Sequence, residues 1–169
     1  LRVLNAGGRP VESLPVAEAR KVLADVQAAV EVDLSGIDER EREIVADGHA
    51  LTLHLVRPHG SRGRPPYFVF IHGGGWVLGD YPTHRRLVRD LVVESEVAAV
   101  FVDYTPSPEA KYPQAVDEIY AAVKWVAEND AELDLDRRRM ALVGNSAGGN
   151  MALAAALLAK KRHAPAVRA

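Results

Sequence analysis

Three short apolar runs without polar alternation dominate the sequence, and segments with helical spacing separate them. The runs are residues 67–71 (Tyr-Phe-Val-Phe-Ile), 98–102 (Ala-Ala-Val-Phe-Val) and 140–143 (Met-Ala-Leu-Val). Strands of a parallel sheet have this composition because helices cover both faces of the sheet. Helical segments between successive strands form right-handed crossovers that keep the strands parallel. The pattern therefore predicts an α/β fold with a mostly parallel sheet.

The segments between and after the runs place apolar residues three and four positions apart, as amphipathic helices do. They cover residues 83–94, 114–128 and 147–161, and the last consists mainly of Ala and Leu, so we expect it to be buried. Upstream, residues 15–30 predict another amphipathic helix. Residues 49–57 alternate between apolar and polar side chains, which predicts a half-buried strand.

A mixed-charge run precedes that strand at residues 38–42 (Asp-Glu-Arg-Glu-Arg). Such runs are typical of solvated surfaces, and we interpret this one as a linker or a helix surface without a chemical role.

The sequence Gly144-Asn145-Ser146-Ala147-Gly148 joins the last apolar run to the last helical segment. A G-x-S-x-G pentapeptide on a strand-to-helix turn is the nucleophile elbow of serine hydrolases. Its glycines let the chain reverse tightly, so that the serine hydroxyl projects outward. The following helix directs free N–H groups toward the place where an oxyanion would form. The motif predicts Ser146 as a nucleophile.

A second motif, His72-Gly73-Gly74-Gly75-Trp76, follows the first apolar run. Consecutive glycines leave backbone N–H groups uncovered, so these groups can approach a substrate oxygen closely. The HGGG segment of esterases forms an oxyanion hole together with the N–H of the residue after the nucleophile, here Ala147. We expect His72 to order this loop through hydrogen bonds and not to act as a base.

With these two motifs the chain resembles the hormone-sensitive-lipase-like family of carboxylesterases, which carry HGGG and GDSAG. The resemblance extends from about Val16 to the end of the sequence. It includes Asp103-Tyr104 with Pro108-Glu109, similar to the family's DYRLAPE, and residues 112–117 at the start of the next helix.

The resemblance implies an α/β-hydrolase fold with residues 1–45 as an N-terminal cap segment over the acyl pocket. Residues 46–169 would form the N-terminal part of the catalytic domain. The expected site consists of Ser146 as nucleophile, Gly74, Gly75 and Ala147 as oxyanion donors, His72 and Gly73 as support for the oxyanion loop, and Trp76 and Asn145 in the substrate pocket.

Two departures from the family pattern concern single motifs. Asn145 stands where the family usually has Asp, which removes a charge beside the nucleophile but keeps the capacity to hydrogen-bond. Thr105-Pro106-Ser107 replaces the usual Arg-Leu-Ala, so no role of that arginine can be transferred.

The third departure concerns the catalytic triad, whose acid and histidine follow the serine in this fold. After Ser146 the sequence has no Asp or Glu, and its one histidine, His163, lies among basic residues at a helix end, as a solvated residue would. We therefore expect a second segment or chain to supply the acid and the histidine, and residues 1–169 alone to be inactive. The remaining histidines are interpreted as structural or solvated.

Composition excludes several other classes of function. The formal net charge of -2 gives no reason to expect nucleic acid or an anionic membrane as partner, and the absence of cysteine excludes disulfides and thiolate chemistry. No run approaches the roughly 20 apolar residues of a membrane span, and no secretory signal layout is visible, so we expect a cytoplasmic protein.

We therefore predict a carboxylesterase that cleaves short- to medium-chain esters through an acyl-enzyme and requires no cofactor. A non-catalytic receptor for small ligands on the same fold and an amide deacetylase remain alternatives, because fold alone does not separate these functions.

Overall fold

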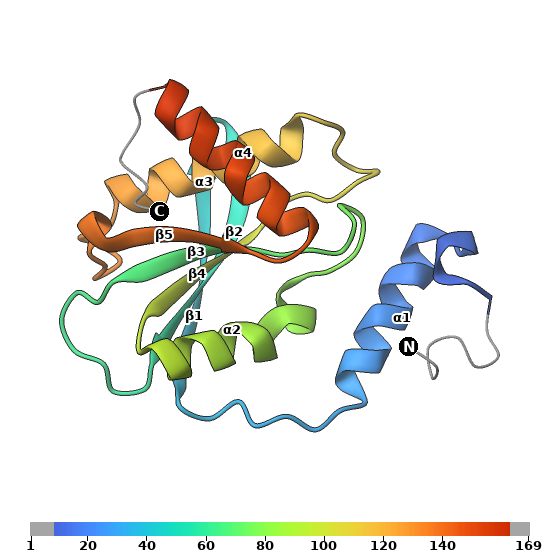
Figure 1. Cartoon of the computed structure of the whole chain (residues 1–169), viewed down its shortest axis with the longest axis horizontal. Coiled ribbons are helices and arrows are strands. Elements are labelled where there is room, and N and C mark those ends of the chain that lie inside the picture. Colours follow the sequence, from blue (N-terminus) through green and yellow to red (C-terminus); the bar gives the residue numbers. More distant parts are fainter. Residues whose placement is uncertain (1–8, 163–169) are drawn as a thin grey trace.

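A computed structural model describes residues 9–162, which form a five-stranded sheet with helices on both faces (Figure 1). The strands are β1 (Ile37–Ala46), β2 (His49–Pro58), β3 (Tyr67–Ile71), β4 (Ala98–Asp103) and β5 (Met140–Gly144). The helices are α1 (Val16–Ala28), α2 (Tyr81–Ser95), α3 (Gln114–Glu128) and α4 (Ala147–Lys161), with short 3-10 turns η1 (Val11–Ser13) and η2 (Arg137–Arg139).

The strand order across the sheet is β1-β2-β4-β3-β5. The three strands predicted from the apolar runs, β4, β3 and β5, are parallel to one another. By contrast, β1 and β2 form an antiparallel hairpin, and β2 is also antiparallel to β4. The predicted α/β fold is confirmed, and its sheet is mixed.

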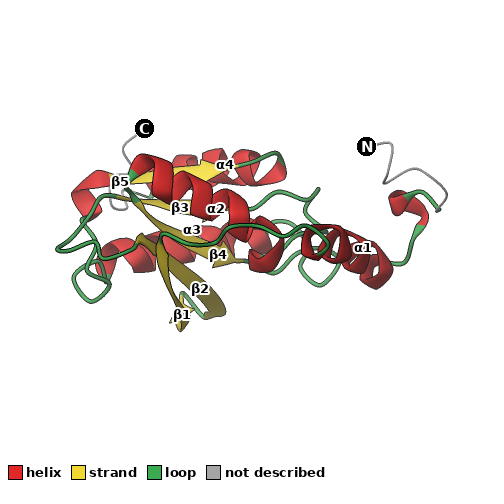
Figure 2. Cartoon of the chain, turned by 90° about the horizontal axis from the view of Figure 1, so that it is seen from below, coloured by secondary structure: helices red, strands yellow, loops and turns green. Residues whose placement is uncertain are grey.

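Two clusters of buried side chains form the core, one on each face of the sheet. Helices α3 and α4 pack on one face and α2 on the other (Figure 1). Strand β3 serves both clusters, because Val69 and Ile71 face α3 and α4 whereas Phe68 and Phe70 face α2. Burial of one large apolar side chain contributes about 1.5–3 kcal/mol to the stability of the fold. Because β3 buries side chains on both faces, it stabilises both helical layers against the sheet. Helix α1 lies to one side of this α/β body (Figures 1 and 2).

The charged residues 38–42 lie in β1, which corrects their interpretation as a linker or helix surface. Asp47 and Gly48 form the two-residue turn between β1 and β2, with φ values of 47° and 87°. Turns with both central residues at positive φ favour Asp-Gly and produce hairpins. The charges are tolerated because β1 is an edge strand whose first half is mostly solvent-exposed. Strand β1 ends at Ala46, so the expected boundary between the cap segment and the catalytic domain, after residue 45, falls inside this strand.

Helix α4 is buried on one face only, whereas its Ala- and Leu-rich sequence suggested general burial. Met151, Ala155 and Ala159 are buried against the sheet and α3. Leu153 and Leu157 are 69% and 68% exposed on the opposite side. Their apolar side chains therefore have no cover within the described part of the chain.

Candidate active site

Ser146 occupies a strained turn between β5 and α4. Its backbone has φ 52° and ψ −121°, a conformation that costs a non-glycine residue about 1–3 kcal/mol. A Cβ added at Gly148 would lie 2.0 Å from the carbonyl oxygen of Ile71, and one at Gly144 would lie 2.5 Å from the backbone of Gly148. Only glycine fits at these two positions, so the elbow has the geometry that its motif predicts, with Ser146 exposed.

The start of α4 leaves the backbone donor directly after the serine uncommitted. Gly148 N–H donates to Asn145 O at 2.8 Å, and Asn150 N–H donates to Ser146 O at 3.2 Å. Ala147 N–H has no acceptor among residues 9–162. Helix α4 spans 15 residues, and the positive end of its dipole therefore lies at this N–H group.

The glycine loop after β3 is a tight turn that only glycine can form at its centre. Gly74 and Gly75 have φ values of 124° and 62°, in the region that side chains disfavour. Val77 N–H and Leu78 N–H both donate to Gly74 O, at 3.2 and 2.9 Å. A Cβ on Gly74 would lie 2.0 Å from Leu78 O, so this position has no room for a side chain.

Asn145 joins the glycine loop to the elbow. Its Oδ1 accepts a hydrogen bond from Gly73 N–H at 2.9 Å, and a Cβ added at Gly73 would lie 3.2 Å from the Cβ of Ser146. Gly73 N–H is thus occupied, whereas the N–H groups of Gly74 and Gly75 find no acceptor in the described residues. The structure therefore brings the elbow that carries the predicted nucleophile into contact with the loop that carries two of the predicted oxyanion donors.

His72 is buried beneath this loop, with 1% of its surface exposed. Its Nδ1 lies 2.8 Å from Gly73 O, and burial lowers the pKa of His72, so a neutral ring donates Nδ1–H to that carbonyl. Tyr104 stacks on the ring at 4.3 Å and donates its hydroxyl hydrogen to His72 O at 3.0 Å. These contacts support the loop-ordering role of His72. Tyr104 was not predicted as a site residue, although the Asp-Tyr motif marked its position.

The stability of the folded protein should decrease in mild acid because of this buried histidine and its neighbour His84. The two rings are 5.3 Å apart, and burial lowers the pKa of both. In the unfolded chain a histidine has a pKa of about 6.5, so below that pH the unfolded state binds protons that the folded state does not. The contribution of the two neutral rings to the free energy of unfolding is fully present above about pH 6.5. It is lost as the pH falls toward the lowered pKa values of the folded state.

Urea titrations of the full-length protein between pH 7.5 and 5.5 measure this effect as a falling free energy of unfolding. His84→Gln should flatten the decline because it removes one of the two groups. His59→Gln is the matched control, since the His59 imidazole is 75% exposed, and it should leave the decline unchanged. A His84→Gln profile as steep as that of the wild type would contradict the assignment.

A cavity of about 500 Å³ lies beside the glycine loop, between α1 and α2. Of the two residues predicted in the substrate pocket, Asn145 lines this cavity and Trp76 does not. Trp76 is 47% exposed, and its carbonyl oxygen accepts a hydrogen bond from Ser107 N–H at 2.8 Å. The residues that line the cavity are Leu23, Gln27, Gly74, Thr83, His84, Arg86, Leu87, Asp90 and Asn145.

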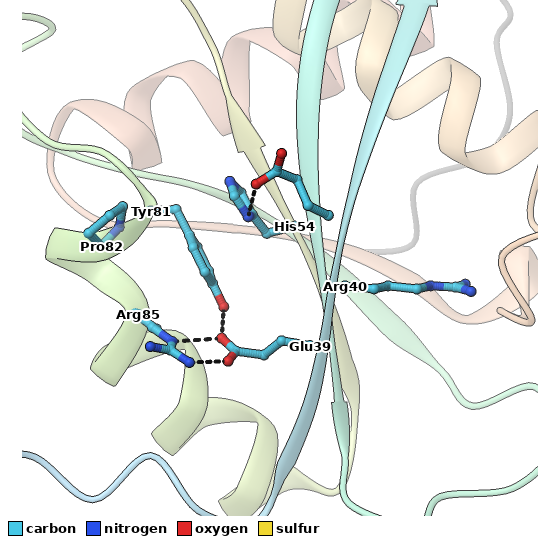
Figure 3. A pocket seen from close by; sticks show the side chains of 7 residues that line it. Glu39, Arg40, His54, Tyr81, Pro82 and Arg85 are labelled. Carbon is cyan, nitrogen blue, oxygen red and sulfur yellow. Dashed lines mark hydrogen bonds and ion pairs between the residues drawn. The ribbon is translucent and has the colours of Figure 1, made fainter.

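A second pocket, of about 270 Å³, lies between β1, β2 and α2 (Figure 3). In it Glu39 accepts hydrogen bonds from Tyr81 and Arg85. His54 stacks on Tyr81 at 4.0 Å, and its Nε2 lies 2.8 Å from a carboxylate oxygen of Asp103. No serine or threonine lines this pocket, and Glu39, Tyr81 and Arg85 pair with one another in it. The cluster therefore fastens the β1-β2 hairpin to α2, and the contacts of His54 favour the first of the two interpretations, structural or solvated, that its sequence left open.

Residues 68–169 match the model of a family described as having the alpha/beta hydrolase fold. This match covers more than half of the chain. The chain belongs to this α/β-hydrolase family. The resemblance to hormone-sensitive-lipase-like carboxylesterases, drawn from the HGGG and G-x-S-x-G motifs, is thereby confirmed.

Relatives of this α/β-hydrolase chain include esterases of known structure. A thermostable esterase from Pseudomonas putida is 54% identical with a TM-score of 0.94, over 98% of this chain and 53% of the esterase. A hyperthermophilic esterase from Pyrobaculum calidifontis is 31% identical with a TM-score of 0.87, over 99% of this chain and 53% of its own. The carboxylesterase NlhH from Mycobacterium tuberculosis is 40% identical over 121 residues, which are 71% of this chain and 38% of NlhH.

The chain thus spans about half of the solved relatives and less than half of NlhH. Neither the acid nor the histidine of a triad can be placed at the site. No Asp or Glu follows Ser146 in the sequence, and His163 lies outside the described residues.

Proposed function

We propose that the whole protein is a serine carboxylesterase that cleaves short- to medium-chain esters. The observation that carries the proposal is the contact between the strained Ser146 elbow and a loop whose Gly74 and Gly75 N–H groups are free of acceptors in the described residues. An exposed nucleophile beside several uncommitted backbone donors suits acyl transfer, in which negative charge develops on a carbonyl oxygen. The esterase relatives agree with this chemistry.

In the proposed reaction Ser146 Oγ attacks the ester carbonyl while its proton passes to a histidine. The N–H groups of Gly74, Gly75 and Ala147 stabilise the oxyanion of the tetrahedral intermediate. The histidine then gives the proton to the leaving oxygen, the bond between the carbonyl carbon and that oxygen breaks, and an acyl-enzyme and the free alcohol result. A water molecule then attacks the acyl-enzyme in the same way and releases the acid. Asn145 and His72 touch no reacting atom in this scheme and hold the glycine loop in place.

We propose further that the acid and the histidine come from a segment or chain outside residues 1–169. The outer edge of β5 supports this, because β5 is the last strand of the sheet and its residues Ala141 to Val143 are only half-buried. The exposed Leu153 and Leu157 flank the same region on α4. An apolar strand edge beside apolar side chains is the surface that further strands and helices would cover.

The oxyanion assignment predicts that Gly75→Val in the full-length protein lowers kcat for 4-nitrophenyl butyrate by about 10²- to 10³-fold, as loss of an oxyanion donor does. A Cβ at Gly75 meets no atom within 4 Å, so the side chain would obstruct the substrate oxygen without colliding with the protein. The φ of 62° adds backbone strain, which the control variant must match. Gly74→Val is less informative, because its Cβ would collide with Leu78 O.

Gly63→Val is the matched control for this substitution. Gly63 has φ 72° and, like Gly75, no atom within 4 Å of an added Cβ, but it lies on a turn outside the site residues. It therefore carries similar backbone strain and should keep wild-type kcat. Equal rates in both variants would place the oxyanion hole elsewhere. A wild-type protein that binds esters without cleaving them would support the receptor alternative. One that cleaves only amides would support the deacetylase alternative.

Within residues 9–162, none of the helices combines the length and the apolar character that crossing a bilayer requires. The cytoplasmic location stays a prediction from the sequence, and fractionation of cells that express the full-length protein would test it.

A further inference from the structure

Arg20 is the strongest polar attachment of α1 to the rest of the molecule. Its Nε donates to Val77 O at 2.8 Å, and one terminal nitrogen donates to Ser107 O at 3.0 Å. Both terminal nitrogens also donate to the carboxylate of Glu109, each at 2.8 Å. Among the described residues, no other side chain of α1 hydrogen-bonds outside the helix, and Ala19 is its one buried residue. The position of α1 therefore depends strongly on a single guanidinium group.

The partners of Arg20 belong to two loops that are themselves held firmly. Val77 lies in the glycine loop, and Ser107 and Glu109 lie in the loop after β4. The two loops are tied together by the hydrogen bond from Ser107 N–H to Trp76 O. The second loop is anchored on α3, because the buried carboxylate of Glu118 accepts Thr105 N–H at 2.7 Å. Arg20 thus fastens a helix with few other attachments to a rigid pair of loops.

Both groups of the pair are charged near neutral pH. Its hydrogen bonds with Arg20 lower the pKa of Glu109 to about 2, so the carboxylate stays ionised in all but strong acid. A planar guanidinium that meets a carboxylate with two parallel hydrogen bonds also fixes orientation, which a lysine ammonium would not do.

Further along α1, Leu23 and Gln27 form part of the wall of the 500 Å³ cavity. They lie three and seven positions after Arg20, and hence one and two turns along the helix. The opposite part of the wall includes Gly74, whose N–H is a proposed oxyanion donor. A shift of α1 would therefore change the size of the cavity relative to the glycine loop.

We propose that Arg20 is a positioning residue that fixes the wall formed by Leu23 and Gln27 relative to the oxyanion loop, and thereby sets which acyl chains the cavity accepts. Arg20 touches no reacting atom in this arrangement. The selectivity part of the proposal rests on the esterase function proposed above, whereas the attachment of α1 does not.

The test uses Arg20→Met and Glu109→Gln in the full-length protein, with hydrogen–deuterium exchange and ester kinetics as separate readouts. Loss of the four hydrogen bonds of Arg20 should let α1 detach more often, so Arg20→Met should raise the exchange rate of residues 16–28 by about 10-fold. Glu109→Gln should produce a smaller rise in the same residues. In kinetics, Arg20→Met should raise KM for butyrate and hexanoate esters by about 10-fold relative to acetate, while kcat for the acetate ester stays within about 3-fold.

Lys21→Met is the matched control. Lys21 is the next residue of α1 and pairs with Asp25 within the helix at 2.8 Å, so its loss should change neither exchange nor acyl preference. Unchanged exchange in Arg20→Met would overturn the attachment, and raised exchange with an unchanged acyl preference would overturn the positioning role. If the wild-type protein hydrolyses no ester, the proposed function fails, and exchange alone decides whether Arg20 holds α1.

Discussion

Replacing Ser146 with alanine in the full-length protein is expected to lower ester turnover by at least about 10⁴-fold, because no other group in the proposed reaction can form the acyl-enzyme. The fold should survive. The substitution keeps the Cβ and removes an exposed hydroxyl that makes no hydrogen bond within the described residues. The backbone strain at φ 52° is the same for Ala as for Ser. Hydrolysis of 4-nitrophenyl acetate and thermal unfolding measure the two effects.

Ser61→Ala is a suitable control, since Ser61 follows β2 in a turn and contacts only Arg57 through its hydroxyl. Turnover in this variant should equal that of the wild type. A fluorophosphonate should modify Ser146 in the wild-type protein and nothing in Ser146→Ala. Wild-type-like turnover in Ser146→Ala, or labelling of another serine, would refute the assignment. The other serines are Ser13, Ser35, Ser61, Ser95 and Ser107.

Residues 1–169 produced alone are expected to hydrolyse no ester and to be insoluble or molten. In the order of this fold the acid and the base follow the serine, and no Asp or Glu follows Ser146 here, so the hydroxyl proton would have no acceptor. The free edge of β5 and the exposed Leu153 and Leu157 would promote aggregation. Gel filtration, near-ultraviolet circular dichroism and ester hydrolysis measure the three properties.

The full-length protein, purified in parallel, provides the positive control for this experiment. It should be monodisperse, unfold cooperatively and hydrolyse esters. A 169-residue chain that does all three without any other polypeptide would show that the proposed second segment is unnecessary.

The strands that carry the site could be predicted closely from the sequence. The predicted run 67–71 coincides with β3, and the predicted helices 114–128 and 147–161 coincide with α3 and α4. Pro66 precedes β3 and Pro113 precedes α3, and the apolar patterns of the three elements agree with burial on the sheet. The position of Ser146 followed because a strained serine turn requires glycine on both sides, and that requirement is visible in the sequence.

Long-range contacts were not predictable, because they depend on which segments the fold brings together. Strand β1 was not predicted because residues 38–42 are all charged, and an exposed edge strand need not alternate between apolar and polar side chains. Asp47-Gly48 was nevertheless a hairpin signal in the sequence. Nothing in the helical pattern of α1 distinguished Arg20 from Lys21, yet only Arg20 reaches Val77 and Glu109. Its partners lie 57 to 89 positions away in the sequence.

The two edge strands of the sheet, β1 and β5, differ in how easily a further strand could pair with them. Along β1, acidic and basic side chains alternate in sign from Glu39 to Glu43, and most of them are solvent-exposed. A foreign strand that added there would have to desolvate these charges, so this border disfavours self-association. Along β5, which ends at the nucleophile elbow, the border is apolar and carries no charge. We therefore expect further strands to add beside β5, where the proposed second segment would come close to Ser146.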